Sequence, residues 1–444
     1  MGIDIKKSLI NTYQRSKNGM YPPVNLRSFK REIVYSVQSA MAKWSPKDNL
    51  NGSGALFQYI DFFSGCGGMS LGFHALSQIA PFFKTLGGCD IDPYASESYN
   101  SNFGVPGIVA DIREMSRNER VFKSFLSKLD GYDKDKPLLV IGCPPCQGFT
   151  THRKRRWDTE EDDERNSLVG IFAEIAVKLN PVCIVMENVP EMLAKKYWRH
   201  YVQARDTFIK AGYTVHQSIY NAAAFGVPQE RFRTIVVAMR REFLLPEPII
   251  SDHREFITVR QAIGNLPPVM PGESDPNDAL HRSAGHKRNT IDTIKAVPKN
   301  GGSRPFGVGP KCLDRIKGFS DVYGRLYWDR PAITITHYAR NPASGRYVHP
   351  EQDRGLTMRE AALLQSFPRG FNFSGTFDSV FKQIGEAVPP KLACGVAVDV
   401  LVELLSPSPN EAELEEGLKS ITEPISNSYS SVIAGIKTNN RRKK

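Results

Sequence analysis

Long apolar runs are missing from this chain of 444 residues. No stretch is long enough to cross a bilayer. The opening segment Met1–Lys7 mixes polar and charged side chains, which excludes the apolar region of a secretory signal. We therefore expect a cytoplasmic protein with no membrane partner.

Cysteine is scarce and irregularly placed. An odd, scattered set favours reduced thiols over a disulfide framework. Cys143 and Cys146 have the C-x-x-C spacing, but no second cysteine pair or histidine pair stands at zinc-binding spacing. We therefore expect no metal and rank a redox role below a nucleophilic one. The seven cysteines are Cys66, Cys89, Cys143, Cys146, Cys183, Cys312 and Cys394.

The composition is that of a globular protein with excess positive charge. Hydrophobic residues make up 41% of the chain, which suits one large domain or a large domain with a smaller partner and excludes disordered and fibrous classes. Lysine and arginine outnumber aspartate and glutamate by 58 to 47, for a formal net charge of +11. This excess favours a polyanionic partner, although many proteins without one are also basic.

Short apolar runs alternate with segments of helical periodicity from Leu56 onward. This alternation predicts an α/β fold with a doubly wound, mostly parallel sheet, of the Rossmann-like kind. The expected strands are 56–63, 85–90, 107–111, 138–142, 182–187, 214–220 and 234–240. The expected helices are 93–102, 121–129, 168–179 and 201–211, and then 357–365 and 392–405.

The chain divides into five predicted segments. After Arg241, prolines, glycines and basic residues interrupt the periodicity, which indicates a smaller second domain. The segments are a basic N-terminal extension (1–55), a large domain (56–241), a small domain (242–325), a return to the large domain (326–405) and a flexible C-terminal tail (406–444).

The stretch Leu138–Gly148 is an apolar strand that runs into a turn stiffened by Pro144 and Pro145 and presents the thiol of Cys146. Open α/β sheets bind ligands just beyond the carboxyl ends of their strands, so this thiol is a candidate nucleophile. The alternative is an incidental cysteine in a loop.

A glycine-rich segment, Asp61–Gly72, leads from a strand into a helix. Its glycines let a ligand approach the backbone, and the helix N-terminus offers N–H donors to a carboxylate or phosphate. Asp90 and Asp111 each end a following strand, and Asp90 stands where an acid accepts from ribose hydroxyls. We favour a nucleoside-bearing ligand over a purely structural turn. The missing G-x-G-x-x-G spacing disfavours a dinucleotide oxidoreductase.

Two further segments bring polar groups to the same sheet edge. Glu187 ends a buried strand, where an apolar setting keeps a carboxyl protonated and able to donate to a base nitrogen, with helix capping as the alternative. Arg231 and Arg233 alternate into a later strand and share a face, from which they can donate to carbonyl, phosphate or carboxylate oxygens. We expect one of these two arginines to form a structural salt bridge instead.

These elements, in this order, resemble the cytosine-C5 DNA methyltransferase family over about residues 56–245 and 325–405. One position departs from the family, which commonly has asparagine where this chain has Glu386, so the cofactor role of that position is left open. The matching motifs are Asp61-x-Phe-x-Gly-x-Gly-Gly, Pro144–Gln147, Asn166–Leu168, Glu187–Val189, Gln229–Arg233, Arg330–Pro331, Gln365–Pro368 and Gln383–Pro390.

The resemblance implies a DNA (cytosine-5-)-methyltransferase that moves a methyl group from S-adenosylmethionine to C5 of a flipped-out cytosine in a specific duplex sequence. Cys146 is implied to add to C6, Glu187 to protonate or hydrogen-bond N3, and Arg231 to hold O2. Residues 242–325 are implied to be the target-recognition domain, and the last motif, Gln383–Pro390, to pack against the cofactor loop.

By the same resemblance, residues are assigned to three groups. The catalytic group is Cys146, Glu187, Arg231, Arg233, Asn188 and Pro145, and the cofactor group is Phe63, Gly65, Gly67, Asp90, Ile91, Asp111, Ile112 and Leu168. Asp90 is assigned to the ribose, Ile91 to the adenine ring and Asp111 to the adenine amino group. The DNA group is Gln147, Arg153, Lys154, Arg155 and Arg156, of which the four cations lie in a loop expected to close on DNA unless it is only a solvated charged loop.

The implied partner is double-stranded DNA, bound by a monomer that pairs in function with a restriction endonuclease without needing physical contact. A tRNA cytosine-C5 methyltransferase and a non-catalytic DNA-binding regulator remain alternatives. The sizeable basic small domain favours duplex DNA over tRNA. The joint presence of Cys146, Glu187 and Arg231 argues against a regulator.

Overall fold

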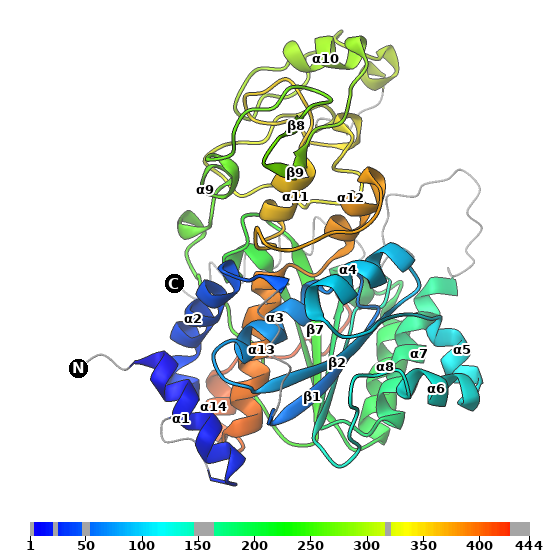
Figure 1. Cartoon of the computed structure of the whole chain (residues 1–444), viewed down its shortest axis with the longest axis vertical. Helices are drawn as coiled ribbons and strands as arrows, with labels where there is room; N and C mark the ends of the chain where they lie inside the picture. The colour runs from blue at the N-terminus through cyan, green and yellow to red at the C-terminus, as the bar shows by residue number, and fades with distance from the viewer. Residues whose placement is uncertain (1–3, 21–24, 47–53, 146–163, 316–320, 427–444) are drawn as a thin grey trace.

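The computed structural model describes residues 4–20, 25–46, 54–145, 164–315 and 321–426. A seven-stranded sheet forms its centre, in the order β3-β2-β1-β4-β5-β7-β6 (Figure 1). The five neighbouring strands β3, β2, β1, β4 and β5 are parallel to one another, and β7 is antiparallel to both β5 and β6. The strands are β1 (Phe57–Phe62), β2 (Phe83–Asp90), β3 (Gly107–Val109), β4 (Leu138–Gly142), β5 (Cys183–Asn188), β6 (Thr214–Asn221) and β7 (Phe232–Met239). All seven predicted strands are confirmed.

Both faces of this sheet are buried, because successive strand residues point to opposite sides. Tyr59 and Val185 belong to one apolar cluster, and their neighbours Ile60 and Ile184 belong to the other. The first face is covered by α2 (Lys30–Ala42), α3 (Gly68–Ser77), α4 (Pro93–Phe103) and α13 (Pro390–Leu405). The second is covered by α5 (Ile112–Arg117), α6 (Glu119–Leu126), α7 (Leu168–Lys178) and α8 (Trp198–Lys210). The predicted doubly wound, mostly parallel class is therefore confirmed.

The order of the strands reverses direction between β1 and β4. From β1 the chain first moves outward through β2 to β3, then crosses back and continues through β4 to β5 on the other side. Such a reversal separates the loops that follow the two central strands and leaves a crevice at their carboxyl ends. The glycine-rich segment after β1 and the proline turn after β4 both start at this position.

The N-terminal segment packs on the large domain. Helix α1 (Ile5–Lys17) is followed by α2, which buries Ile33, Val34 and Val37. Two cations join this segment to α13, since Lys30 lies 2.8 Å from Asp399 and Arg27 lies 2.9 Å from Glu403. The described part of residues 1–55 therefore contributes to the core of the large domain.

The chain after α13 also packs on the sheet. Beyond the short helix α14 (Glu411–Glu416), the N–H of Ile421 donates to the carbonyl of Gln217 at 3.1 Å, and that of Ile425 donates to Leu193 at 3.0 Å. Residues 406–426 thus differ from the predicted flexible tail, because the two isoleucines pack against the cluster on the second face of the sheet. Residues 427–444 lie outside the described residues.

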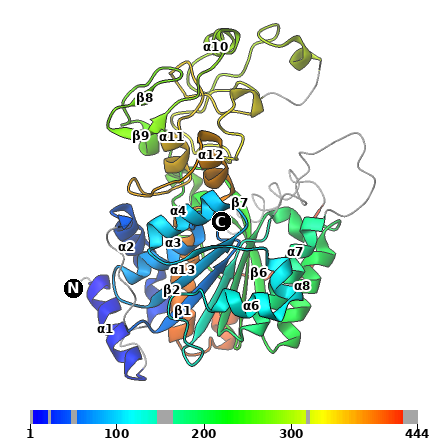
Figure 2. The same ribbon diagram turned by 45° about the vertical axis from the view of Figure 1, so that its right-hand side comes forward.

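The small domain stands at one end of the molecule, with α10 farthest from the large sheet (Figures 1 and 2). It has little regular structure: α9 (Val259–Ile263), β8 (Ser274–Asp275), β9 (Asp278–Arg282) and α10 (Arg288–Lys295). Its core contains Val348 beside Ile294 and Val322. This contact extends the domain past the predicted boundary at residue 325, because Val348 also forms bridges with Arg325 and Gly355. Helices α11 (Met358–Leu364) and α12 (Phe377–Glu386) then lead back to the sheet.

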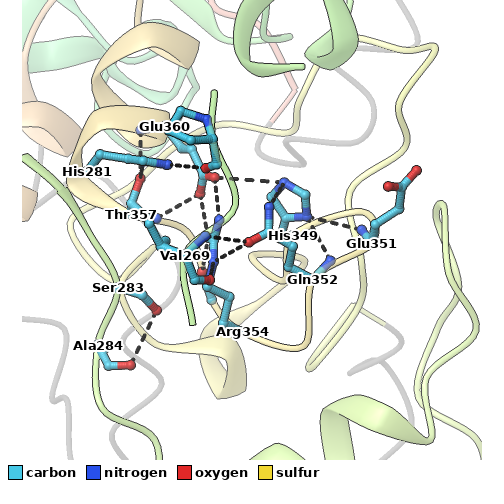
Figure 3. A network of polar contacts seen from close by, with 12 residues as sticks. Val269, His281, Ser283, Ala284, His349, Glu351, Gln352, Arg354, Thr357 and Glu360 are labelled. Atoms are coloured by element: carbon cyan, nitrogen blue, oxygen red, sulfur yellow. Dashed lines mark hydrogen bonds and ion pairs between the residues drawn. The ribbon is translucent and has the colours of Figure 1, made fainter. Parts of the chain in front are cut away.

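A buried polar network joins the small domain to α11 (Figure 3). The guanidinium of Arg354, which is fully buried, donates to both carboxylate oxygens of Glu360 at 2.8 and 2.7 Å and to the carbonyl of Val269 at 3.0 Å. Glu360 in turn accepts from the N–H of Thr357, whose hydroxyl lies 3.0 Å from Nδ1 of His281. These contacts, which we name the Glu360 network, fix the start of α11 against β9. No helix in the described ranges is long and apolar enough to span a membrane.

Candidate active site

Strand β4 delivers the proline turn to the carboxyl edge of the sheet. The N–H of Cys143 donates to the carbonyl of Phe62 at 3.1 Å, which extends the pairing with β1. The side-chain amide of Asn188 donates to the carbonyl of Pro144 at 3.1 Å and so fixes the turn against β5, with the half-buried Pro145 next in the chain. The predicted nucleophile Cys146 and the predicted DNA contacts Gln147, Arg153, Lys154, Arg155 and Arg156 lie outside the described residues.

Glu187 lies beside this turn, near the end of β5. Its carboxylate accepts from Nε of Arg233 on β7 at 2.7 Å, and the side chains of Glu187 and Arg233 are only 9% and 11% exposed. Burial raises the pKa of Glu187, and the positive charges of Arg233 and Arg231 oppose this shift. The capping alternative does not hold, because the next helical turn, Pro190–Leu193, has Val189 as its N-cap. Glu187 is therefore a buried carboxyl at the sheet edge, with a raised affinity for a proton.

Arg231 has a different position from the one expected. Its guanidinium donates to three backbone carbonyls, those of Ile335 at 2.9 Å, Gly385 at 3.0 Å and Ala387 at 3.2 Å, and the residue is only 2% exposed. This geometry corrects the expectation that Arg231 contacts the base. Arg233, the other arginine of the motif, is the one that reaches Glu187.

Two glutamines beside this site were not assigned a role from the sequence. The side chain of Gln229 accepts from the N–H of Ile335 at 2.9 Å and donates to the carbonyl of Leu364 at 2.9 Å. Gln365 donates to the carbonyls of Ile384 and Ala387 at 3.0 and 2.7 Å. Together they connect the start of β7, the end of α11 and the end of α12. Each glutamine is the first residue of a matched motif, and this position could have marked it as important. The sequence does not show which backbone groups a buried amide contacts.

The glycine-rich loop after β1 has a left-handed backbone at several positions. Phe63, Gly65 and Gly67 have φ values of 54°, 52° and 98°. The N–H of Gly65 donates to the carboxylate of Asp90 at 2.8 Å, and the other oxygen of Asp90 accepts from the N–H of Asp92 at 2.9 Å. Asp90 thus holds the loop after β1 against the end of β2.

Open space and unpaired polar groups around this loop fit a bound ligand. A Cβ placed on Gly65 would meet nothing within 4 Å, and Ile91 is 64% exposed directly after β2. Among the described residues, Oδ1 of the buried Asp61 has no hydrogen-bond partner. Burial also raises the pKa of Asp61 to about 8, so this carboxyl carries a proton at neutral pH. The loop therefore leaves open space beside its backbone at Gly65 and an apolar surface at Ile91 for a ligand.

Three other predicted cofactor residues have partners inside the protein. The carboxylate of Asp111 accepts from Nη2 of Arg113 at 2.8 Å and from the N–H of Arg113 at 2.9 Å, and these hydrogen bonds lower its pKa. Ile112 and Leu168 are buried at the starts of α5 and α7. The structure thus places these three side chains in internal contacts.

The last matched motif packs against the cofactor loop, as expected. A Cβ on Gly68 would lie 2.3 Å from the carbonyl oxygen of Val388, so the two backbones are in direct contact. Gln383 accepts from the hydroxyl of Ser98 on α4 at 2.6 Å. Glu386, where the family commonly has asparagine, is exposed at the end of α12.

A doubly wound sheet with a glycine-rich loop at its switch point is an arrangement in which open α/β sheets bind ligands, and a buried acid lies beside it. The model of the family described as C-5 cytosine-specific DNA methylase matches residues 57–401, and the chain belongs to this family. It is a DNA (cytosine-5-)-methyltransferase, and its substrate is DNA. No group of three or more potential metal ligands was found in the parts of the chain that the structure describes.

Proteins named as type II methyltransferases or methylases align with most of the chain. It is 35% identical to the type II methyltransferase M1.HphI of Haemophilus parahaemolyticus, over 77% of this chain and 86% of that protein. It is 31% identical to the type II methylase M.HgiDII of Herpetosiphon aurantiacus, over 77% and 94%. The fold is similar to that of a crystal structure described as a prophage-encoded DNA modification methyltransferase of E. coli, with a TM-score of 0.59 at 22% identity, covering 79% of this chain and 100% of that one.

Proposed function

We propose that this enzyme methylates one cytosine within a specific duplex sequence, after flipping it out of the stack, with S-adenosylmethionine as the methyl donor. The observation that carries the proposal is the pair formed by Glu187 and Arg233 at 2.7 Å, buried beside the turn that leads to Cys146. A buried acid and an adjacent guanidinium suit a ring nitrogen next to a carbonyl, which is the N3 and O2 edge of cytosine.

The residues after β1 and β2 would hold the cofactor. Phe63, Gly65 and Gly67 would line its methionine part, Asp90 its ribose and Ile91 its adenine, which the open space at Gly65 and the exposure of Ile91 support. The cofactor supplies an electrophilic methyl group.

The protein's part in the chemistry is to make C5 of cytosine nucleophilic. The thiolate of Cys146 adds to C6, while the carboxyl of Glu187 gives a proton or hydrogen bond to N3 and Arg233 holds O2. This addition moves the C5–C6 electron pair into a C4–C5 enamine, and C5 of the enamine would then take the methyl group while the sulfonium leaves as a neutral thioether. Loss of the C5 proton to a base restores the double bond and expels the thiolate. Base flipping costs a few kcal/mol, which contacts to the DNA backbone must offset.

Bisulfite sequencing of a plasmid from expressing cells tests this proposal. The native chain should protect one cytosine in one sequence context, and Cys146→Ser should protect none. Glu187→Gln and Arg233→Ala should lower the rate of methylation of that site by about 10²–10⁴-fold, the range for loss of a proton-transfer or charge-stabilising group.

Arg240→Ala is the matched control, because Arg240 follows the same strand but is exposed. This variant should retain the native rate. Absence of 5-methylcytosine with the native chain, or equal losses in Arg233→Ala and Arg240→Ala, would contradict the proposal.

We further propose that residues 242–355 read the target sequence, and that the enzyme acts as a cytoplasmic monomer paired in function with a restriction endonuclease. The type II names of the relatives support the pairing. The charge distribution supports the DNA contact. Residues 281–325, which we name the basic segment, contain ten lysines and arginines and three aspartates and glutamates. Residues 242–280, which we name the acidic segment, contain two lysines and arginines and seven aspartates and glutamates. The basic segment therefore suits DNA phosphates.

A further inference from the structure

Phe306 is the most exposed large apolar side chain among the described residues, with 86% of its surface accessible. It lies in the basic segment of the small domain. Single exposed apolar residues are common on proteins, so exposure alone has no functional meaning. The construction of the loop around Phe306 is the second observation.

The tip of this loop is a tight turn with Phe306 at its second position. The N–H of Val308 donates to the carbonyl of Pro305 at 3.3 Å, and Gly307 has a φ of 79°. A positive φ at the third position is that of a type II turn, in which glycine is the preferred residue. This geometry directs the side chain at the second position away from the body of the loop.

A buried arginine braces the turn from inside. Arg304, whose side chain is 8% exposed, forms an ion pair with Asp314 at 2.9 Å and donates to the carbonyl of Pro305 at 3.2 Å. It also donates to Val308 at 2.6 Å, so both ends of the turn are held by one guanidinium. Arg304 therefore has a structural role in this loop.

The base of the loop is held by two more arginines. Arg346 donates to the carbonyls of Gly301 and Gly302 at 2.8 and 3.1 Å and to the hydroxyl of Ser303 at 2.8 Å. The N–H of Arg325 donates to the carbonyl of Gly302 at 2.9 Å. A rigid base and a rigid tip leave Phe306 exposed without freedom to fold back onto the domain.

The loop lies in the basic segment, next to α10. Gly309 lies against Thr293 of α10, and the short helix Lys311–Asp314 follows it in the chain. Exposed Lys311 and Arg315 stand close by in the sequence and offer charges to phosphates.

We propose that Phe306 is a specificity-determining residue that packs against the 5-methyl group of a thymine in or beside the target sequence. The inference rests on the proposed role of the small domain in reading DNA. A phenyl ring has no hydrogen-bonding group, and the thymine methyl is the apolar mark that base pairs present in the major groove. The cations of the basic segment would hold the backbone while the ring contacts the base edge.

Thymine-to-deoxyuridine substitution removes only that methyl group and so tests the contact directly. Once bisulfite sequencing has located the site, each thymine in and around it is replaced in turn in a synthetic duplex, and kcat/KM is measured. For the native enzyme, one replacement should lower kcat/KM about four- to tenfold. Phe306→Ala should lose about the same factor on the natural duplex and show no further loss on the substituted one. Phe306→Leu, which keeps an apolar contact, should retain most of the sensitivity.

Ile209→Ala is the matched control, because Ile209 is 50% exposed on α8 of the large domain, outside the residues proposed to read DNA. It should keep the native kcat/KM and the native response to deoxyuridine. Melting temperature and binding of S-adenosylmethionine should be unchanged in all three variants.

Two results would overturn the inference: native activity in Phe306→Ala, or a deoxyuridine effect that persists undiminished in that variant. An equal loss on every duplex, with no thymine dependence, would show a wedge or shape contact and would also refute it. Failure of the proposed function looks different, because the native enzyme would then show no methylation of a defined site at all.

Discussion

The large and small domains are held together by different means. In the large domain, backbone groups pair with one another along seven strands, and apolar side chains such as Tyr59 and Ile60 fill both faces of the sheet. In the small domain, backbone carbonyls accept from buried arginines. Arg325, which is fully buried, donates to four of them, in Ile294, Val297, His349 and Gln352.

The difference shows how an irregular chain can still be rigid. Buried carbonyls need donors, and a loop-rich domain lacks the strand partners that supply them. One guanidinium carries five N–H donors in a fixed plane, so a few arginines can order many loop residues. The loops of the small domain can therefore vary in sequence, provided that these arginines stay in place.

Removing one of these arginines should have the largest effect on stability. Arg354→Met leaves Glu360 as an unpaired buried charge, and we expect the free energy of unfolding to fall by about 3–5 kcal/mol. Chemical denaturation measures this loss. Arg260→Ala is the control, since its ion pair with Asp329 is exposed, and its melting temperature should equal that of the native protein. A native-like Arg354→Met would show that arginines do not hold the small domain together.

Acid should weaken both domains through one buried histidine in each. Burial lowers the pKa of His74, packed on Trp44, and that of His349, beside Glu360, to about 4 in each case. An unfolded histidine binds a proton near pH 6.5. Because the unfolded chain takes up protons first, stability is complete above about pH 6.5 and falls as the pH drops toward 4.

Each histidine contributes up to roughly 3 kcal/mol of this acid sensitivity. His74→Gln and His349→Gln should each reduce the loss of unfolding free energy between pH 7 and pH 4.5, as measured by denaturant titration. If either variant loses as much stability as the native protein, the corresponding histidine is not held neutral by its domain.

The smallest effect concerns the two oppositely charged segments of the small domain. Lys287→Ala and Arg288→Ala, at exposed positions of the basic segment, should each reduce the slope of log K against log salt for DNA binding by about 1. Arg254→Ala, in the acidic segment, should leave the slope unchanged. If the slope changes equally in all three variants, the charge difference between the two segments does not determine which part of the small domain binds DNA.

The large domain was predictable from the sequence because buried parallel strands are continuous apolar runs, and each predicted strand lies within two residues of the observed one. The matched motifs also predicted that Glu187 and the proline turn share one sheet edge. Their detailed partners were not predictable. Arg231 lies just before β7 and Arg233 lies on it, two residues apart, yet Arg231 meets Ile335, which is 104 residues away in the sequence.

The small domain resisted prediction for a related reason. Its hydrogen bonds come from long-range arginine contacts, such as that of Arg325 with Ile294, which have no periodic signal in the sequence. The extension of the domain to Gly355 likewise depends on the position of Val348 in its core, which local patterns do not show.

The packing of the N-terminal segment on α13 has a consequence for the timing of biosynthesis. Arg27 must find Glu403, 376 residues later in the chain. At about 5–20 residues per second, a ribosome needs roughly 20–75 s to make that intervening length. During this interval α2 and α3 lack the helix that buries their shared face. The large domain can close only when translation has passed α13, so a nascent chain released before that point would lack a finished cofactor domain.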